Sequence, residues 1–299
     1  MNLRSLNVHL ETGWQLSKVT YTFIMDHKKI ALFMVFSAIL FVIVSILLTI
    51  ILLPSAFFSL FLPDKTIMPT LLMLFFIFFV ISSFVREFSN TALSYYVLQI
   101  LNNQQPSIRA SLSRTISRFS IIFAWACVNS LIGTWVRLVQ NKNGTSGINK
   151  IIGNILSSTI LLNWNILTFF TTPLIAAEDN GILDTITESG TLIEKQWGKA
   201  LTTSFGIHWI GLSLLFSFYL LFFTPFYLVI WFFPPMLPNE KIFYTTLGLS
   251  AFFVPLIIIL YLVRTMTVTL KTVLYNYANN KPTGPFGKRL LQSTFLPSN

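Results

Sequence analysis

Arg86, Glu87 and Arg264 interrupt long apolar runs, and they are the residues of this chain that are most suited to chemistry. A charged side chain in the hydrocarbon of a membrane is costly, so it is normally kept for a partner or a function. Two interpretations follow. Glu87 pairs with one of the arginines and locks the helices together, or both arginines form a site for an anion or a lipid head group.

A stripe of polar side chains between residues 148 and 177 is the second candidate. Its members are spaced so that they share one face of a helix: Asn154, Ser158, Asn165, Thr168 and Thr172. Such groups hydrogen-bond between helices in a membrane, and they also suit the wall of a polar path. Both interpretations stay open.

Other chemistry lacks the residues it needs. His9, His27 and His208 have no metal-ligand spacing, and no nucleotide-binding or nucleophile motif is present. The single cysteine, Cys127, excludes an intrachain disulfide. Carboxylates gather between residues 178 and 194, where a solvated helix face explains them. We therefore predict no metal, no cofactor and no catalytic residue.

The composition indicates the elements that must hold these residues. The 299 residues are 54% hydrophobic and 10% charged, which is too apolar for a soluble domain. A membrane-spanning helix needs about 20 apolar residues. Six runs reach this length, at 30–53, 66–101, 119–139, 148–177, 201–233 and 242–277. The sequence predicts an all-α integral membrane protein with six transmembrane helices.

The connections suggest that the six helices form three hairpins. Amphipathic segments precede the hairpins, at 11–23, 108–119 and 182–199. Each hairpin ends in a polar pair: Asn102-Asn103, Asp179-Asn180 and Asn279-Asn280. This arrangement suggests three copies of one unit, in which Arg86 and Arg264 occupy nearly equivalent places.

The basic residues set the orientation. They gather at the N-terminus, after the second and fourth runs, and at the C-terminal end, to which we assign Lys271. Cytoplasmic segments collect such residues, so both termini are predicted to be cytoplasmic. The chain then divides into a cytoplasmic amphipathic segment (1–29), a six-span transmembrane domain (30–280) and a cytoplasmic tail (281–299). The net charge of +10 suits anionic lipid head groups, and nucleic acid is not expected.

A motif around residue 178 carries a resemblance to a known family. Its residues are 171–181, with Pro173 and Glu178, followed by Trp197-Gly198; Trp14 and Asn90 complete the pattern. Over residues 11–210 the chain resembles a bacterial family of multi-pass membrane proteins known only as a domain of unknown function. It is more loosely similar to the membrane domains of some glycerophosphodiester phosphodiesterases. The resemblance implies a six-span protein of the bacterial inner membrane and no known chemistry.

The sequence favours a non-enzymatic, lipid-interacting scaffold or accessory subunit whose amphipathic segments lie on the inner leaflet. One alternative is a transporter or channel for a small solute or lipid, with a polar path along the fourth run. A weaker alternative is a membrane-embedded lipid enzyme. The sequence leaves open a protein partner or a second copy of the chain.

Overall fold

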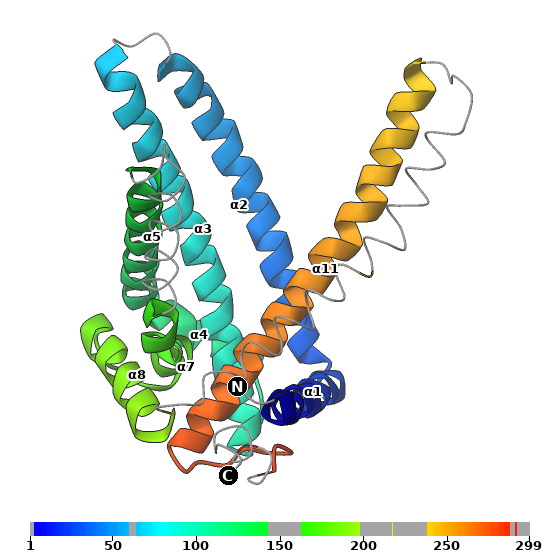
Figure 1. Ribbon diagram of the computed structural model, residues 1–299, viewed down its shortest axis with the longest axis vertical. Helices are drawn as coiled ribbons and strands as arrows, with labels where there is room; N and C mark the ends of the chain where they lie inside the picture. Colours follow the sequence, from blue (N-terminus) through cyan, green and yellow to red (C-terminus); the bar gives the residue numbers. More distant parts are fainter. Residues whose placement is uncertain are drawn as a thin grey trace.

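The computed structural model describes residues 3–59, 64–142, 163–197, 217, 238–287 and 291. These residues form helices joined by short loops and contain no strand, which confirms the all-α prediction (Figure 1). Four helical stretches are long and apolar enough to cross a membrane: Lys29–Ser55, Pro69–Leu101, Phe119–Val136 and Leu256–Ala278. They belong to helices α2 (Lys29–Ser59), α3 (Asp64–Leu101), α5 (Phe119–Lys142) and α11 (Pro238–Ala278).

Four of the six predicted runs coincide with these helices. The predicted run 201–233 lies outside the described residues except for Ser217, and so does most of the run 148–177. Residues 163–167 are helical, residues 168–170 form a turn, and the short helix α7 (Thr171–Ala177) follows. Lys271, which we assigned to the C-terminal end, falls within the candidate span Leu256–Ala278, and α11 stays helical to Ala278.

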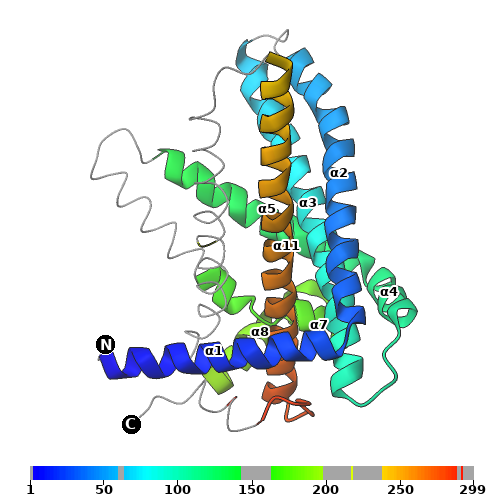
Figure 2. The ribbon, with the colours of Figure 1, turned by 90° about the vertical axis from the view of Figure 1, so that its right-hand side faces the viewer.

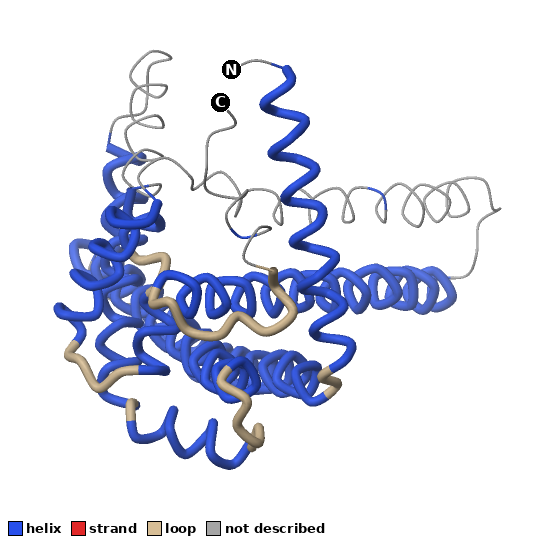
Figure 3. Tube along the Cα trace, turned by 90° about the horizontal axis from the view of Figure 1, so that it is seen from below, coloured by secondary structure: helices blue, strands red, loops and turns tan. Residues whose placement is uncertain are grey.

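Helix α1 (Leu3–Asp26) runs across one end of the bundle, transverse to α2 and α11 (Figure 2). Viewed from below, it leaves the bundle sideways toward the N-terminus (Figure 3). Its inner face buries Leu16, Thr20 and Phe23, whereas Trp14 and Tyr21 are exposed. Helices α4 (Ile108–Ser117) and α8 (Ile182–Trp197) lie at the same end, which we call the amphipathic end (Figure 1).

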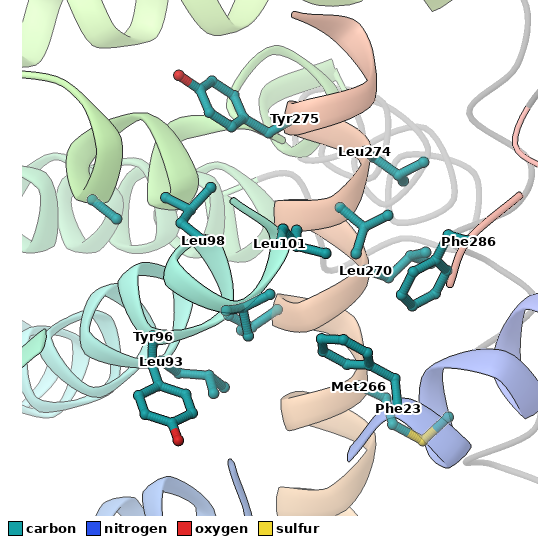
Figure 4. Packing of buried hydrophobic residues seen from close by; sticks show 14 of the residues in the cluster. Phe23, Leu93, Tyr96, Leu98, Leu101, Met266, Leu270, Leu274, Tyr275 and Phe286 are labelled. Atoms are coloured by element: carbon teal, nitrogen blue, oxygen red, sulfur yellow. The ribbon is translucent and has the colours of Figure 1, made fainter. Parts of the chain in front are cut away.

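The main core lies where α3 and α11 cross at the amphipathic end (Figure 4). Tyr96 and Leu101 of α3 and Leu274 of α11 are almost fully buried there, and Phe23 of α1 and Phe286 join them. Small side chains let the two backbones approach. The Ser94 and Thr272 hydroxyl oxygens are 2.8 Å apart and both residues are fully buried, so a hydrogen bond crosses the contact.

Helix α4 presents a mixed face to the bundle. The sequence places Ile108, Leu112, Ile116 and Phe119 on one side with Arg114 and Arg118 opposite. Ile108 and Leu112 pack on the core, but Ile116 and Phe119 are exposed. The arginines reach inward to the end of α7. An exposed apolar edge beside a protein-facing polar side suits a helix lying at a membrane interface.

Helices α3 and α11 end in the same way. Asn103 and Asn280 have φ values of 56° and 54°, in the left-handed region. After α3 the Gln104 N–H donates to the Gln99 carbonyl at 2.8 Å, and after α11 the Lys281 N–H donates to the Asn276 carbonyl at 2.8 Å. This is the Schellman arrangement, in which asparagine replaces the usual glycine. The polar pairs Asn102-Asn103 and Asn279-Asn280 thus share a left-handed second residue, whereas Asp179-Asn180 does not have one.

Replacing Asn280 by alanine is expected to destabilise the chain by about 1 kcal/mol, because a Cβ without a polar group is strained in the left-handed region. Asn280→Gly should be neutral or slightly stabilising, because glycine has no such strain. Thermal unfolding in detergent compares the two variants with the wild type. Equal melting temperatures for the alanine and glycine variants would contradict the left-handed conformation.

Candidate functional site

A pocket of about 640 Å³ opens between α2, α3, α5 and α11. This volume lies within the range of pockets that bind small ligands. The wall combines aromatic and aliphatic groups with hydroxyl, amide and guanidinium groups, from Phe41, Phe78, Phe79, Ser82, Ser83, Arg86, Asn129, Ser130, Gly133, Thr134, Leu260, Tyr261 and Arg264. We call it the arginine pocket. Its mixed wall suits an amphiphile better than a purely polar solute.

Arg264 is held firmly at the wall of this pocket. Its Nε donates to the Asn90 Oδ1 at 2.9 Å, and its Nη2 donates to the Arg86 carbonyl oxygen at 2.5 Å. The guanidinium also lies 5.6 Å from the centre of the Tyr261 ring. These contacts orient the group and connect α11 to α3, as the packing interpretation of Arg264 requires.

Arg86 is held less firmly. Its Nε lies 3.5 Å from the Glu87 Oε1, and its Nη2 donates to the Ser83 hydroxyl at 3.3 Å. Its side chain is 51% exposed, compared with 10% for Glu87. The Glu87 carboxylate also accepts a hydrogen bond from the Thr172 hydroxyl at 3.3 Å. Glu87 therefore serves packing, while Arg86 keeps much of its guanidinium open to the pocket.

The charges at this depth do not balance among the described residues. The Arg86 guanidinium lies beside the Glu87 carboxylate, and Arg264, which donates to the Arg86 carbonyl oxygen, lines the same pocket. The Lys271 ammonium lies further along α11, 4.7 Å from the centre of the Phe169 ring. Two guanidinium groups and one carboxylate leave an excess of positive charge that a bound anion would neutralise.

The depth of the pocket follows from a neighbouring cavity. Arg264 and Ser37 line the same small cavity, and Ser37 lies eight residues after the start of α2 at Lys29. At about 1.5 Å per residue, this places Arg264 about 12 Å from Lys29 along the helix axis. The hydrocarbon core is about 30 Å thick. The arginines therefore lie in the half of the membrane nearer the amphipathic end.

Two hydroxyl groups in the pocket have no hydrogen-bond partner among the described residues. Ser82 and Ser130 line it from α3 and α5, and their oxygens are buried without a hydrogen bond. A buried polar group normally has a partner. The Asn129 amide, also in the wall, accepts a hydrogen bond from the Trp164 indole at 3.0 Å. The two serines are additional groups that a polar ligand would satisfy.

The predicted polar stripe lies apart from the arginine pocket where the structure describes it. Asn154 and Ser158 fall outside the described residues. Asn165 is exposed, and the Thr168 hydroxyl donates to the Trp164 carbonyl at 2.7 Å. Thr172 bonds to Glu87 instead. The described members thus make helix contacts, and the polar groups of the pocket come from α3, α5 and α11.

A second polar cluster lies at the amphipathic end, where two arginines bind the end of α7. Arg114 donates from Nε to the Ala176 carbonyl (3.1 Å), from Nη1 to Asp179 (2.7 Å) and from Nη2 to the Glu178 carbonyl (3.0 Å). Arg118 donates to the Asn180 carbonyl. Burial and the neighbouring charge of Arg114 lower the pKa of Arg118, and Asp179 opposes them. Cations are favourable at a helix C-terminus.

Glu178 is the centre of this cluster. Its carboxylate accepts from the Tyr275 hydroxyl at 2.6 Å and from the Asn180 amide at 3.0 Å. The same amide donates to Glu188 at 2.7 Å. The cluster joins α7, α8 and α11, so the solvated-face interpretation was wrong for Glu178 and Glu188. Their spacing in the sequence gave no sign that Tyr275 would reach them.

Burial and the neighbouring Glu178 raise the energy of the charged form of Glu188. Burial, followed by the charge and hydrogen bonding of Glu178, raises the pKa of Glu188 above its ordinary value of 4.5, while Asn180 and Lys281 oppose the shift. Because the folded state holds this proton more tightly, the stability that protonation contributes is present at low pH. It is lost as the pH rises through the folded-state pKa.

Glu188→Gln removes this charge and is expected to raise the melting temperature at neutral pH. The gain should shrink toward about pH 4.5, where the wild-type carboxyl is also protonated. The other charged side chains at this cluster, which also bear on its pH dependence, are Glu178, Asp179, Arg114, Arg118 and Lys281. Thermal unfolding at a series of pH values tests this, with the exposed Glu194→Gln on the same helix as control. Destabilisation by Glu188→Gln at neutral pH would contradict it.

The other family-motif residues are dispersed. Asn90 holds Arg264, and Pro173 is buried in α7. Trp14 is 51% exposed, with the Lys18 ammonium 5.7 Å from the centre of its ring. Trp197 ends α8, and Gly198 lies outside the described residues. Among the motif residues whose side chains the structure describes, Asn90 is the one that bonds to an arginine of the pocket.

The comparisons with known proteins agree with the resemblance seen in the sequence. No curated protein matches the chain. The model of one family of unknown function, DUF6159, matches residues 69–285, which is most of the chain. The matched part includes both polar clusters and extends beyond the region of the sequence resemblance, but it leaves out Trp14. This chain therefore belongs to the family of unknown function DUF6159.

Proposed function

We propose that this chain is a lipid-interacting membrane protein that binds the anionic head group of a lipid in the arginine pocket. The observation that carries the proposal is the excess of positive charge at the pocket: the Arg86 and Arg264 guanidinium groups line it, and one carboxylate, Glu87, lies beside Arg86. A phosphate or carboxylate bound by the two arginines would balance this charge and accept charge-assisted hydrogen bonds.

The surroundings of the pocket suit a lipid. Phe41, Phe78 and Leu260 line it together with the guanidinium groups, so the lining offers both apolar and cationic groups. Trp14 and Tyr21 of α1 are exposed near Lys18. Aromatic and basic side chains of this kind anchor amphipathic helices at a lipid interface.

The biological role that we infer is a non-enzymatic scaffold or accessory subunit of the bacterial inner membrane. In this proposal both termini are cytoplasmic, and α1, α4 and α8 lie on the inner leaflet. The distribution of basic residues in the sequence supports the orientation. The exposed apolar edges of α1 and α4 support the contact with the leaflet.

Identification of the lipids that co-purify with the full-length protein tests the binding. After mild extraction from bacterial membranes, native mass spectrometry should find anionic phospholipid enriched over phosphatidylethanolamine. The Arg86→Gln variant should lose this enrichment, whereas Arg109→Gln, which changes an exposed charge on α4, should keep it. Co-purified lipids in the same proportions as in the membrane would contradict the proposal.

The size of the pocket also favours a second candidate, a transporter of a small anion. A pocket of about 640 Å³ at membrane depth, with Asn129 and Thr134 in its wall, could hold a hydrated anion. Uptake of radiolabelled phosphate into proteoliposomes distinguishes the two functions. Saturable uptake that Arg264→Gln abolishes would favour transport, and uptake equal to that of protein-free vesicles would favour the lipid site.

A further inference from the structure

An apolar groove lies next to the arginine pocket, between α2 and α3. It has a volume of about 230 Å³, and Leu48, Leu52, Leu71, Leu74, Phe75 and Phe78 line it. We call it the leucine groove. Phe78 belongs to both walls, so the two spaces meet at this side chain. The lining is almost wholly apolar, and Thr49 is its one residue with a polar side chain.

The sequence makes the two spaces one stripe on each helix. On α3, Leu71, Leu74, Phe78, Ser82 and Arg86 are spaced by three or four residues, so they follow one face. On α2, Phe41, Leu48 and Leu52 are seven and four residues apart and also follow one face, and the two helices lie side by side in Figures 1 and 2. The stripe is therefore cationic at one end and apolar along the rest of its length, and it lies on a single face of the α2–α3 pair.

We propose that the leucine groove holds an acyl chain of the lipid whose anionic head group binds Arg86 and Arg264. This inference rests on the proposed function and adds the class of ligand, a long-chain anionic phospholipid. The occupant follows from charge complementarity at one end of the stripe and from the two spaces adjoining at Phe78.

The dimensions agree with one chain of a membrane lipid. At about 1.5 Å per residue, Phe78 lies about 12 Å and Leu74 about 18 Å along α3 from Arg86. A chain anchored at Arg86 therefore passes Phe78 and extends about 18 Å to reach Leu74.

The groove differs from bulk lipid in packing, not in polarity. Lipid tails around the protein are as apolar as leucine, so the preference for the groove comes from close contact. Filling the groove with a larger side chain should then weaken the binding of a long-chain ligand by about three- to ten-fold. A short-chain ligand with the same head group should not be affected, because it does not reach Leu74.

The test uses the full-length protein in a neutral detergent and two probes, dioleoyl and dihexanoyl phosphatidylglycerol. Leu74→Trp, with Leu52→Trp as a second variant from the opposite wall, fills the groove. Met73→Trp is the matched control, because Met73 is the adjacent residue but is 65% exposed and does not line the groove. Native mass spectrometry gives each dissociation constant.

We expect the groove variants to bind dioleoyl phosphatidylglycerol more weakly and dihexanoyl phosphatidylglycerol as the wild type does, with Met73→Trp affecting neither. Undiminished binding of both probes to Leu74→Trp and Leu52→Trp would overturn the groove but leave the arginine pocket in place. A wild-type protein that does not prefer phosphatidylglycerol to phosphatidylcholine would overturn the proposed function itself.

Discussion

Replacing Arg264 by glutamine is expected to weaken the binding of dioleoyl phosphatidylglycerol by about ten- to hundred-fold, because a hydrogen bond to a charged group contributes about 1.5–3 kcal/mol. The loss has two sources. Glutamine removes one of the two guanidinium groups of the pocket, and it also releases Asn90 and the Arg86 carbonyl. Arg86→Gln should reduce binding to a similar extent with less effect on folding, since Arg86 is half exposed.

The measurement is a titration of each purified variant with the lipid, together with its thermal unfolding. Arg109→Gln, an exposed charge on α4, controls for the change in net charge. If both pocket variants melt early but bind the lipid as tightly as the wild type, the arginines serve packing only. An equal loss in the Arg109 variant would indicate a non-specific attraction to the charge of the protein.

Arg114→Ala is expected to destabilise the chain by about 3 kcal/mol, the largest effect on folding that we predict. Arg114 makes three charge-assisted hydrogen bonds to residues 176–179. Each such bond contributes about 1.5–3 kcal/mol, but the sum must be reduced because the Asp179 side chain is 78% exposed and its pair is screened by water. Removal also leaves the last carbonyls of α7 without a donor.

Thermal unfolding in detergent measures this effect as a melting temperature about 6–12 °C below that of the wild type. Arg114→Lys keeps the charge but lacks the planar fork, so it should restore only part of the loss. The control is Arg109→Ala on the same helix. Wild-type stability of Arg114→Ala would show that the α4–α7 contact is not a structural joint.

Much of the membrane architecture could be predicted from the sequence because the hydropathy of a span is summed over a long run of residues. The four candidate spans fall in runs that hydropathy alone selects, and the amphipathic periodicity of 108–119 and 182–199 coincides with α4 and α8. The turn at Thr168–Phe170 could not be predicted in this way. Nothing in its composition differs from the run around it, and the hydrogen bond from the Phe170 N–H to the Ser189 hydroxyl depends on α8.

The candidate site was predictable only where a charge stood out against its apolar surroundings. Arg86, Glu87 and Arg264 were identified because ionisable residues are rare in such runs. Lys271 was missed because it lies closer to the polar end of its helix, and the continuation of α11 to Ala278 decides its place. Ser82, Ser130 and Asn129 carry no signal in sequence, since only the packing of α3 against α5 brings them to one pocket.

The similar ends of α3 and α11 bear on the predicted repeat. Beyond the left-handed asparagines, each helix uses an amide side chain to hold the loop that follows. The Gln99 Oε1 accepts from the Ser107 N–H at 2.7 Å, and the Asn276 Nδ2 donates to the Pro282 carbonyl at 2.9 Å. In this register Glu87 corresponds to Arg264. The two helices thus place opposite charges at equivalent positions, beside the same pocket.

The most direct test of the lipid site is an electron cryo-microscopy structure of the full-length chain in nanodiscs that contain phosphatidylglycerol and phosphatidylcholine. We predict density for a phosphate group between the guanidinium groups of Arg86 and Arg264, continuing as a chain past Phe78. In nanodiscs of phosphatidylcholine alone, the phosphate density should weaken. A pocket filled by protein side chains, or density of equal strength in both lipids, would contradict the account.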